Sequence, residues 1–215
     1  MTSGGRELLK WLALVLMTGD HVVTVLDLGY VPVVSELGRV AFPVFALVMA
    51  FNLAQPGANT AKSAQRLATW GIAATPVAVL AFGQLLPLNV LLTFAVAAGC
   101  VWAIERRYWM LVAFLAIVAP AWLDYAWPGV WLVLAGWRWY RGQDGQPWLV
   151  WGCMGLLCAY NGNTWALLAI PALRLGHLNV AVPRSGKAFY GYYVAHLALL
   201  AGVVAFAGGS AALLG

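Results

Sequence analysis

The chain has 215 residues, of which 63% are hydrophobic and 9% are charged. Soluble globular domains carry about 25% charged residues, so this composition excludes a protein whose surface faces water throughout. The net charge of +5 rests on twelve Lys and Arg residues that are scattered in ones and twos. Their scatter between apolar segments favours a role in membrane orientation over a basic surface for nucleic acid.

Apolar segments separated by Pro, Gly and charged residues follow one another along the whole chain. A membrane-spanning helix needs about 20 apolar residues, and backbone that faces lipid must satisfy its hydrogen bonds within the element, which favours helices. The pattern predicts one all-α domain over residues 1–215, a polytopic membrane bundle of about nine transmembrane helices. The predicted helices cover 8–28, 34–54, 64–83, 88–104, 108–123, 127–141, 147–160, 163–176 and 187–208, and the sixth to eighth are short enough to be tilted, re-entrant or merged.

The basic residues predict the orientation of these helices. The first apolar run follows Arg6 and Lys10 as in a signal peptide, but it continues to about Leu28 without a small-x-small cleavage site, so we expect it to remain as the first span. With the amino terminus in the cytoplasm and the carboxyl terminus outside, eleven of the twelve basic residues fall at cytoplasmic ends, as the positive-inside rule requires. These are Arg6, Lys10, Lys62, Arg66, Arg106, Arg107, Arg138, Arg141, Arg174, Arg184 and Lys187.

Ionisable residues lie deep in the first and last predicted spans. At a rise of 1.5 Å per residue, Asp20 and His21 lie about 15 Å beyond Lys10, and His196 lies about 13 Å beyond Lys187. An ionisable group at the centre of a bilayer costs a few kcal/mol, so it requires a partner, a water-filled cavity or a function. A lone histidine there could serve as a structural hydrogen-bonding group, but two at one depth beside a carboxylate favour proton transfer.

Further polar residues gather in the outer half of the predicted bundle. Arg39 lies there, and two explanations remain open: a local ion pair with Glu36, three residues earlier on the same helix face, or an anionic partner such as Asp20 or a substrate carbonyl. Asn89 and Asp124 stand at positions typical of helix caps, which is their alternative to a binding role. The remaining polar candidates in this half are Thr93, Asn161 and Asn163.

The three cysteines carry no metal or redox pattern. Cys100, Cys153 and Cys158 each lie inside an apolar segment, without the CxxC or histidine spacing of a zinc site. We interpret them as small buried residues and expect no metal.

Six stretches contain motifs: LLKWLALVLMTGDHVVTVL, LGRVAFPVFALVMAFNLA, LNVLLTFAV, DYAWPGVW, YNG and FYGYYVAHL. In this order and spacing the chain resembles the TraX family of membrane proteins, from near Leu9 to about Leu200. The MxxDH and GRxAFPxFA patterns are the most specific of these pieces. The chain departs from the expected pattern at Gly19, where an aliphatic residue would precede the Asp-His pair.

The resemblance implies a branch of the multi-span transmembrane acyltransferases of the bacterial inner membrane. The name-giving plasmid member is associated with amino-terminal acetylation of pilin subunits of conjugative pili. By this resemblance the acyl donor is acetyl-CoA, and the acceptor is a pilin or another envelope molecule with a peptide amine, a sugar hydroxyl or a lipid group. The motif residues carried over are Lys10, Asp20, His21, Gly38, Arg39, Phe42, Pro43, Asn52, Arg66, Asn89, Thr93, Asp124, Asn161, Lys187, Tyr193 and His196.

Acyl transfer from a thioester needs a base for the acceptor proton and a donor that faces the developing oxyanion. We expect His21 or His196 to be the base, with His21 preferred, and Asp20 to hold a histidine in the useful tautomer. Arg39 or Asn89 would stabilise charge. The predicted substrate-binding residues are Asn89, Thr93, Asp124, Asn161 and Tyr193, and those predicted to bind the CoA phosphates are Lys10, Arg66 and Lys187.

Two other classes of protein fit the same residues. A proton-coupled transporter or channel also places Asp, His and Arg at the membrane midplane, although the two halves of the chain show no inverted repeat. A non-enzymatic assembly factor of an envelope machine is the third possibility.

Overall fold

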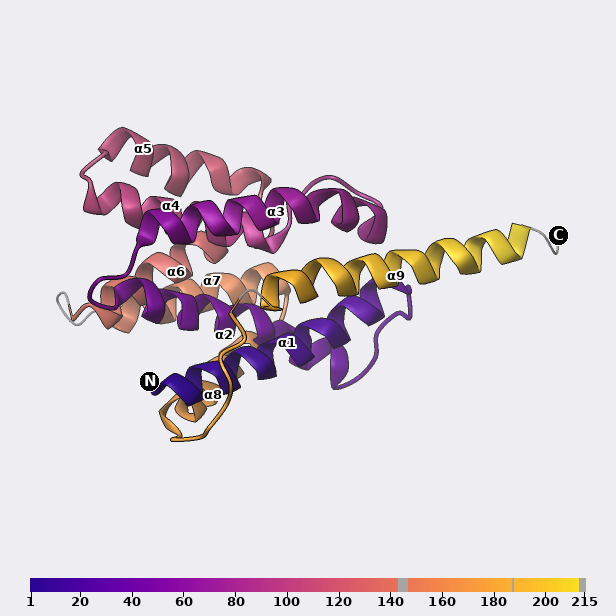
Figure 1. Ribbon diagram of the computed structural model, residues 1–215, viewed down its shortest axis with the longest axis horizontal. Helices are drawn as coiled ribbons and strands as arrows, with labels where there is room; N and C mark the ends of the chain where they lie inside the picture. Colours follow the sequence, from indigo (N-terminus) through magenta and orange to yellow (C-terminus); the bar gives the residue numbers. More distant parts are fainter. Residues whose placement is uncertain (143–146, 187, 213–215) are drawn as a thin grey trace.

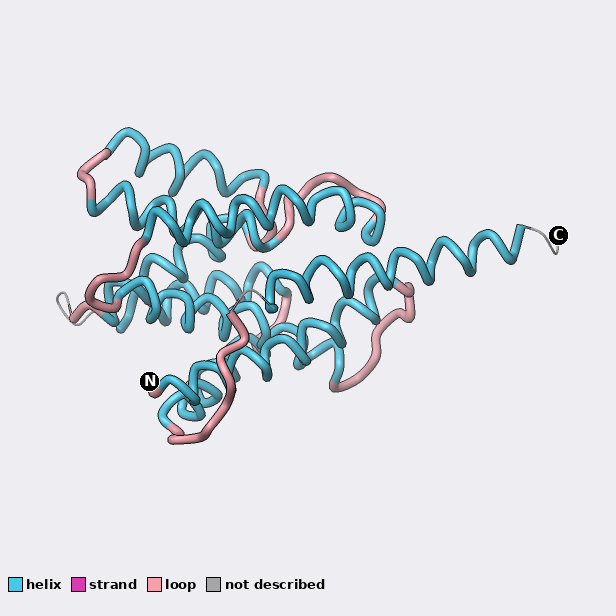
Figure 2. Tube along the Cα trace, in the orientation of Figure 1, coloured by secondary structure: helices cyan, strands magenta, loops and turns pink. Residues whose placement is uncertain are grey.

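The computed structural model describes residues 1–142, 147–186 and 188–212, with side chains up to Phe206. Every regular element in these ranges is helical, and short loops join most of them (Figure 2). The elements are α1 (Ser3–Val25), α2 (Val34–Ala54), α3 (Thr60–Phe82), α4 (Val90–Glu105), α5 (Trp109–Ala113), η1 (Phe114–Val118), η2 (Ala119–Trp122), α6 (Ala126–Tyr140), α7 (Pro147–Asn161), η3 (Trp165–Leu168), α8 (Ala169–Ala172), η4 (Leu173–His177) and α9 (Ala188–Ala212). The predicted all-α class is confirmed, and each of the nine predicted segments coincides with helix.

Among the described helices, three are long and apolar enough to cross a membrane. They cover Ser3–Val25, Val34–Ala54 and Ala188–Phe206. Helices α6 and α7 have 15 residues each, which is about 22 Å and falls short of a hydrocarbon core of about 30 Å. The chain therefore has the helices of a membrane protein, while nine complete crossings stay a prediction.

The loops after α2 and α4 and the last turn of α6 lie at the end of the bundle where the chain begins, and the loops after α1 and α3 lie at the opposite end (Figure 1). The first group of loops and the helix ends beside them carry basic residues. We call this the basic end, defined by Arg6, Lys10, Lys62, Arg66, Arg106, Arg107, Arg138 and Arg141. The fold thus brings together the basic residues that the sequence spreads over residues 1–141, with the exception of Arg39.

Helix α2 lies at the centre of the bundle. It buries eleven residues, among them Gly38, Phe42 and Pro43, and packs against α1 on one side and α6 on another. Helix α3 pairs with α4 and also contacts α9. The helices α1, α2, α3 and α9 consequently surround the space in which the deep polar residues lie.

Residues Trp109–Trp122 form one helical stretch with an irregular centre. The α-helical turn α5 changes into the π-helical turn η1 and then into the 3₁₀ turn η2, which contains Pro120. Proline supplies no backbone N–H, and α6 supplies two indole donors at this place. The Trp131 indole donates to the Ala116 carbonyl at 2.9 Å, and the Trp127 indole donates to the Ile117 carbonyl at 2.9 Å.

Candidate functional site

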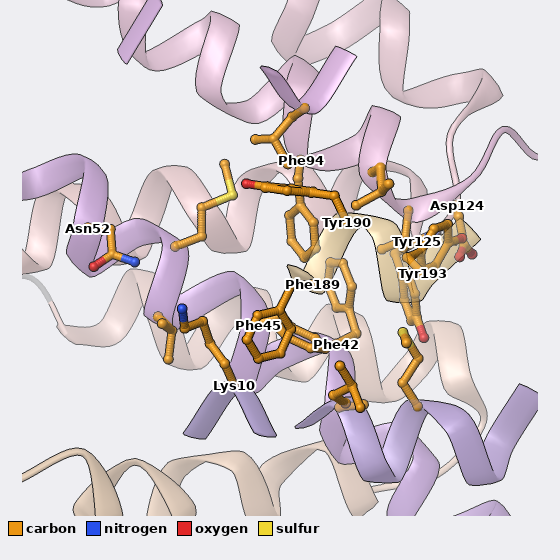
Figure 3. Close-up of a pocket in the computed structure, with 18 of the residues that line it drawn as sticks. Lys10, Phe42, Phe45, Asn52, Phe94, Asp124, Tyr125, Phe189, Tyr190 and Tyr193 are labelled. Carbon is orange, nitrogen blue, oxygen red and sulfur yellow. Dashed lines mark hydrogen bonds between the residues drawn. The ribbon is translucent and has the colours of Figure 1, made fainter. Parts of the chain in front are cut away.

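A cavity of about 390 Å³ enters the bundle from the basic end. Lys10, Asn52, Ser63 and Arg66 line its mouth, and Asp124 and Tyr193 line its deepest part. Figure 3 shows Lys10 and Asn52 at one side of the cavity and Asp124, Tyr125 and Tyr193 at the other. His21 lines the inner part of the cavity and follows Lys10 by eleven positions in α1, so at 1.5 Å per residue the cavity extends about 16 Å along this helix.

The mouth of this cavity combines positive charge with aromatic rings of α9. The Lys10 ammonium lies 4.9 Å from the centre of the Phe189 ring, and the Arg66 guanidinium lies 5.6 Å from the centre of the Tyr190 ring. Lys10 also pairs with Glu7 at 2.7 Å. Two predicted phosphate-binding residues therefore lie at one mouth, whereas the third, Lys187, lies outside the described residues.

The wall between mouth and floor is mostly apolar. Phe42, Phe45, Phe94 and Phe189 line it together with aliphatic and methionine side chains from α1, α2 and α4, and Figure 3 shows these aromatic rings between Asn52 and Asp124. An apolar channel with charge at its mouth suits an elongated ligand that has an anionic head.

A second cavity, of about 290 Å³, approaches the same region from the opposite end. Its lining is more polar and includes Arg39, Thr75, Asn89 and Tyr160, with Gln84 from the loop after α3. We call it the polar cavity and the first one the apolar cavity.

The two cavities share one layer of residues. Asp20, His21, Asp124, Tyr125 and Tyr193 line both of them. We call these five residues the shared layer. A molecule in each cavity would thus meet the same side chains from opposite directions.

Opposite charges gather beside the shared layer. Asp20 and Asp124 line the polar cavity together with Arg39. Glu36, the alternative partner of Arg39, instead accepts hydrogen bonds from the Tyr30 hydroxyl and from the Val33 backbone N–H at the start of α2. Arg39 therefore shares a cavity with these two carboxyl groups, whereas Glu36 has other hydrogen-bond partners.

Close approach of α1 and α2 places Asp20 in this layer. A Cβ atom on Gly38 would lie 2.6 Å from both Cβ and Oδ1 of Asp20, nearer than two nonbonded atoms approach. Gly38 consequently makes room for Asp20, and the next residue, Arg39, lines the polar cavity with it.

The two deep histidines contact each other, as their equal predicted depth indicates. His21 Nδ1 lies 2.8 Å from His196 Nε2, and the rings are stacked with centroids 5.1 Å apart. His196 Nδ1 lies 2.9 Å from the Tyr192 carbonyl oxygen, one turn earlier in α9. Asp20, expected to orient a histidine, makes no hydrogen bond to either ring within the described part of the chain.

Asp124 and Tyr125 are held by the loop that precedes α4. The Leu88 backbone N–H donates to the Trp122 carbonyl at 2.8 Å, and the Asp124 N–H donates to the Leu88 carbonyl at 2.9 Å. The Thr93 hydroxyl donates to the Asp124 carbonyl at 2.8 Å. These bonds fix the backbone from which the Asp124 carboxyl reaches the shared layer.

Tyr125 occupies the left-handed backbone region, with φ at 59°. Non-glycine residues rarely adopt this conformation, and where they do, surrounding contacts enforce it. Here the Tyr125 ring stacks on Phe42 with centroids 3.8 Å apart, above Gly129, where a Cβ would lie 2.8 Å from Tyr125 Cβ. The shared layer therefore contains a tyrosine that packing holds in place.

The other predicted substrate-binding residues lie around this centre. Asn89 caps α4 through the Leu91 N–H and donates to the Gly71 carbonyl and the Thr75 hydroxyl, while it also lines the polar cavity. Thr93 is fully buried and lines neither cavity. Asn161 also lies outside both linings, at the end of α7, and both polar atoms of its side chain are buried without a hydrogen-bond partner among the described residues.

Sequence reasoning did not single out Tyr125 as a site residue. The signal was present in the stretch DYAWPGVW, where Tyr125 directly follows the predicted Asp124. Its entry into the shared layer depends on its positive φ and on the stacking with Phe42, neither of which residue spacing can indicate.

Comparison with known proteins identifies relatives over nearly the whole chain. A family model described as "TraX protein" matches residues 5–204. "Protein TraX" of Escherichia coli and "Protein TraX" of Escherichia coli (strain K12) are each 31% identical over 220 residues, covering 94% of this chain and 88% of the relative. No solved structure matches the chain.

Proposed function

Because the chain belongs to the TraX family, we propose that it is an acyltransferase of the bacterial inner membrane. It moves an acetyl group from acetyl-CoA to an acceptor of the cell envelope, a pilin or another molecule with a free amine. The observation that carries this proposal is the shared layer, in which two cavities from opposite ends reach the same ionisable residues.

The proposed topology is a multi-pass bundle of nine membrane segments with the basic end in the cytoplasm. The gathering of basic residues at one end supports this orientation because cytoplasmic loops carry an excess of Lys and Arg. The apolar cavity then opens toward the cytoplasm, where acetyl-CoA is made, and the polar cavity opens toward the envelope.

Acetyl-CoA enters the apolar cavity with its phosphates at Lys10 and Arg66. The pantetheine arm extends along the aromatic wall, and the thioester reaches the shared layer about 16 Å away. Both basic side chains are packed on aromatic rings, and this packing limits the conformational freedom that binding must remove.

The acceptor amine enters the polar cavity and meets Asp20 and Asp124. Carboxyl oxygens accept hydrogen bonds from an amine, and Arg39 lines the same cavity. His21, which lines both cavities, takes a proton from the amine as its nitrogen attacks the thioester carbonyl.

The proposal is tested with purified protein, radiolabelled acetyl-CoA and a synthetic peptide that has a free amino terminus. We expect label to appear in this peptide, but not in the same peptide with a blocked amino terminus or with a His21→Gln variant. Acetyl-CoA should also raise the thermal unfolding midpoint more than an unrelated nucleotide does. Absence of both transfer and stabilisation would overturn the proposal.

A proton-coupled transporter is the second candidate, because a layer of ionisable residues reached from both ends also suits transport. Proteoliposomes distinguish the two functions. A transporter would move protons with a solute in the absence of acetyl-CoA, whereas the enzyme would show neither uptake nor proton movement under that condition.

A further inference from the structure

Three hydrogen-bonding groups form a chain that begins at the backbone of α9. The first is the Tyr192 carbonyl oxygen, the second is the His196 ring and the third is the His21 ring. The distances that join them are 2.9 Å from the carbonyl oxygen to His196 Nδ1 and 2.8 Å from His196 Nε2 to His21 Nδ1.

The carbonyl decides where the protons of a neutral pair lie. A carbonyl oxygen only accepts, so His196 Nδ1 must carry a proton. In a neutral ring His196 Nε2 then has none and accepts from His21 Nδ1, which must in turn be protonated. His21 Nε2 is consequently the unprotonated nitrogen, and it makes no hydrogen bond within the described part of the chain.

The two histidines differ in their access to the cavities. His21 lines both of them, whereas His196 lines neither and is 7% exposed. His196 also stacks on Tyr192, with ring centroids 5.1 Å apart, and Tyr192 is anchored to α1 by a hydrogen bond with Thr18 at 2.8 Å. His196 is thus a fixed group behind the ring that faces the substrates.

We propose that His196 is a positioning residue, which fixes His21 in the Nδ1–H tautomer and so makes Nε2 of His21 the atom that takes the acceptor proton. This inference rests on the acyl transfer proposed above and assigns to His196 the orienting function that the sequence suggested for Asp20. Asp20 is then left to bind the acceptor amine.

The acetyl transfer needs no reactant besides the two substrates and His21. The amine nitrogen forms a bond to the thioester carbonyl carbon, and the carbon–sulfur bond breaks. His21 Nε2 takes one proton from the amine and delivers it to the departing sulfur, so that the products are the amide and the free thiol. While His21 carries the extra proton, its Nδ1–H continues to donate to His196 Nε2, which stabilises the positive ring.

Nitrogen-15 NMR of histidine-labelled protein tests the tautomer without any substrate. The chain has three histidines, so one substitution at each assigns every ring. We expect both His21 and His196 to show a protonated Nδ1 and a bare Nε2. In His196→Leu the His21 proton should move to Nε2, the form that free imidazole side chains prefer, whereas the amide oxygen of His196→Gln should keep it on Nδ1.

A proton on His21 Nε2 in the wild-type protein, or an unchanged His21 tautomer in His196→Leu, would overturn the inference. Thermal unfolding of each variant shows whether it is folded, and if His196→Leu is unfolded the wild-type spectrum and His196→Gln still decide the question.

Acetyl transfer provides the second readout. His196→Leu should lower kcat by about 100-fold, at the lower end of the usual contribution of acid–base groups, while the KM for acetyl-CoA stays constant. His196→Gln should recover much of this loss, and His177→Leu, on the exposed turn η4, should have no effect. Equal activity of His196→Leu and wild type would contradict positioning, whereas inactive wild-type protein with the expected NMR tautomers would reject the proposed reaction alone.

Discussion

At Gly38, helix α2 approaches Asp20 of α1 closely beside the candidate site. A Cβ atom there would lie 2.6 Å from Asp20 Oδ1, so Gly38→Ala should force the helices apart and destabilise the fold by about 1–3 kcal/mol. Gly155→Ala, at a glycine of α7 with open space around it, is the matched control and should be neutral or slightly stabilising. Thermal unfolding in detergent measures both, and equal midpoints for the two variants would show that the close contact is unimportant.

Asp124 offers a change of charge with little change of shape. Its Oδ1 accepts from the Tyr125 N–H at 2.9 Å, and the amide oxygen in Asp124→Asn can accept the same bond. We expect the KM for the acceptor amine to rise about tenfold through loss of one charge-assisted hydrogen bond. Stabilisation by acetyl-CoA should persist, and an unchanged acceptor KM would remove Asp124 from the binding site.

The individual site residues were predictable to different degrees. Counting residues from Lys10 and Lys187 placed His21 and His196 at one depth because a helix has a constant rise per residue, and the structure places their rings in contact. The pairing of His196 with His21, rather than with Asp20, depends on how α1 and α9 are rotated about their axes. That rotation is set by tertiary packing, which spacing along one helix does not contain.

At the scale of elements, breaks marked by Pro, Gly and charge predicted the helices well. The predicted range 34–54 coincides with α2, and 108–123 coincides with the stretch from α5 to η2. The π-helical turn at Phe114–Val118 was not predicted; two of its carbonyl oxygens accept hydrogen bonds from indoles of α6. Such a contact between distant segments leaves no periodic signal in the sequence.

The indole hydrogen bond from Trp131 to this irregular turn should contribute to the stability of the fold. Trp131→Phe keeps most of the ring but removes the indole N–H that donates to the Ala116 carbonyl, and should lower the free energy of unfolding by about 1 kcal/mol. Trp148→Phe, at an exposed tryptophan of α7, provides the control and should have little effect. The comparison is made by thermal unfolding, and a larger loss in Trp148→Phe would contradict the assigned role of Trp131.

For the whole molecule, the proposed acyl transfer requires acetyl-CoA to enter from the basic end, where the apolar cavity opens. Lys10→Gln and Arg66→Gln should each weaken acetyl-CoA binding about tenfold, and the effect should shrink at high salt because the lost contacts are ionic. Arg106→Gln changes a basic residue at the same end that lines neither cavity. A loss in Arg106→Gln as large as in Lys10→Gln would indicate a general charge effect instead of a binding site at the cavity mouth.

In the proposed acyl transfer, two cavities that reach one layer of residues from opposite ends let donor and acceptor approach from opposite sides of the membrane. The most direct measurement uses sealed proteoliposomes with the protein in one known orientation, acetyl-CoA on one side and a membrane-impermeant peptide with a free amino terminus on the other. We predict acetylated peptide only when acetyl-CoA is on the side of the basic end and the peptide is on the opposite side. Acetylation that requires both molecules on the same side, or that proceeds equally in the reverse arrangement, would contradict transfer through the shared layer.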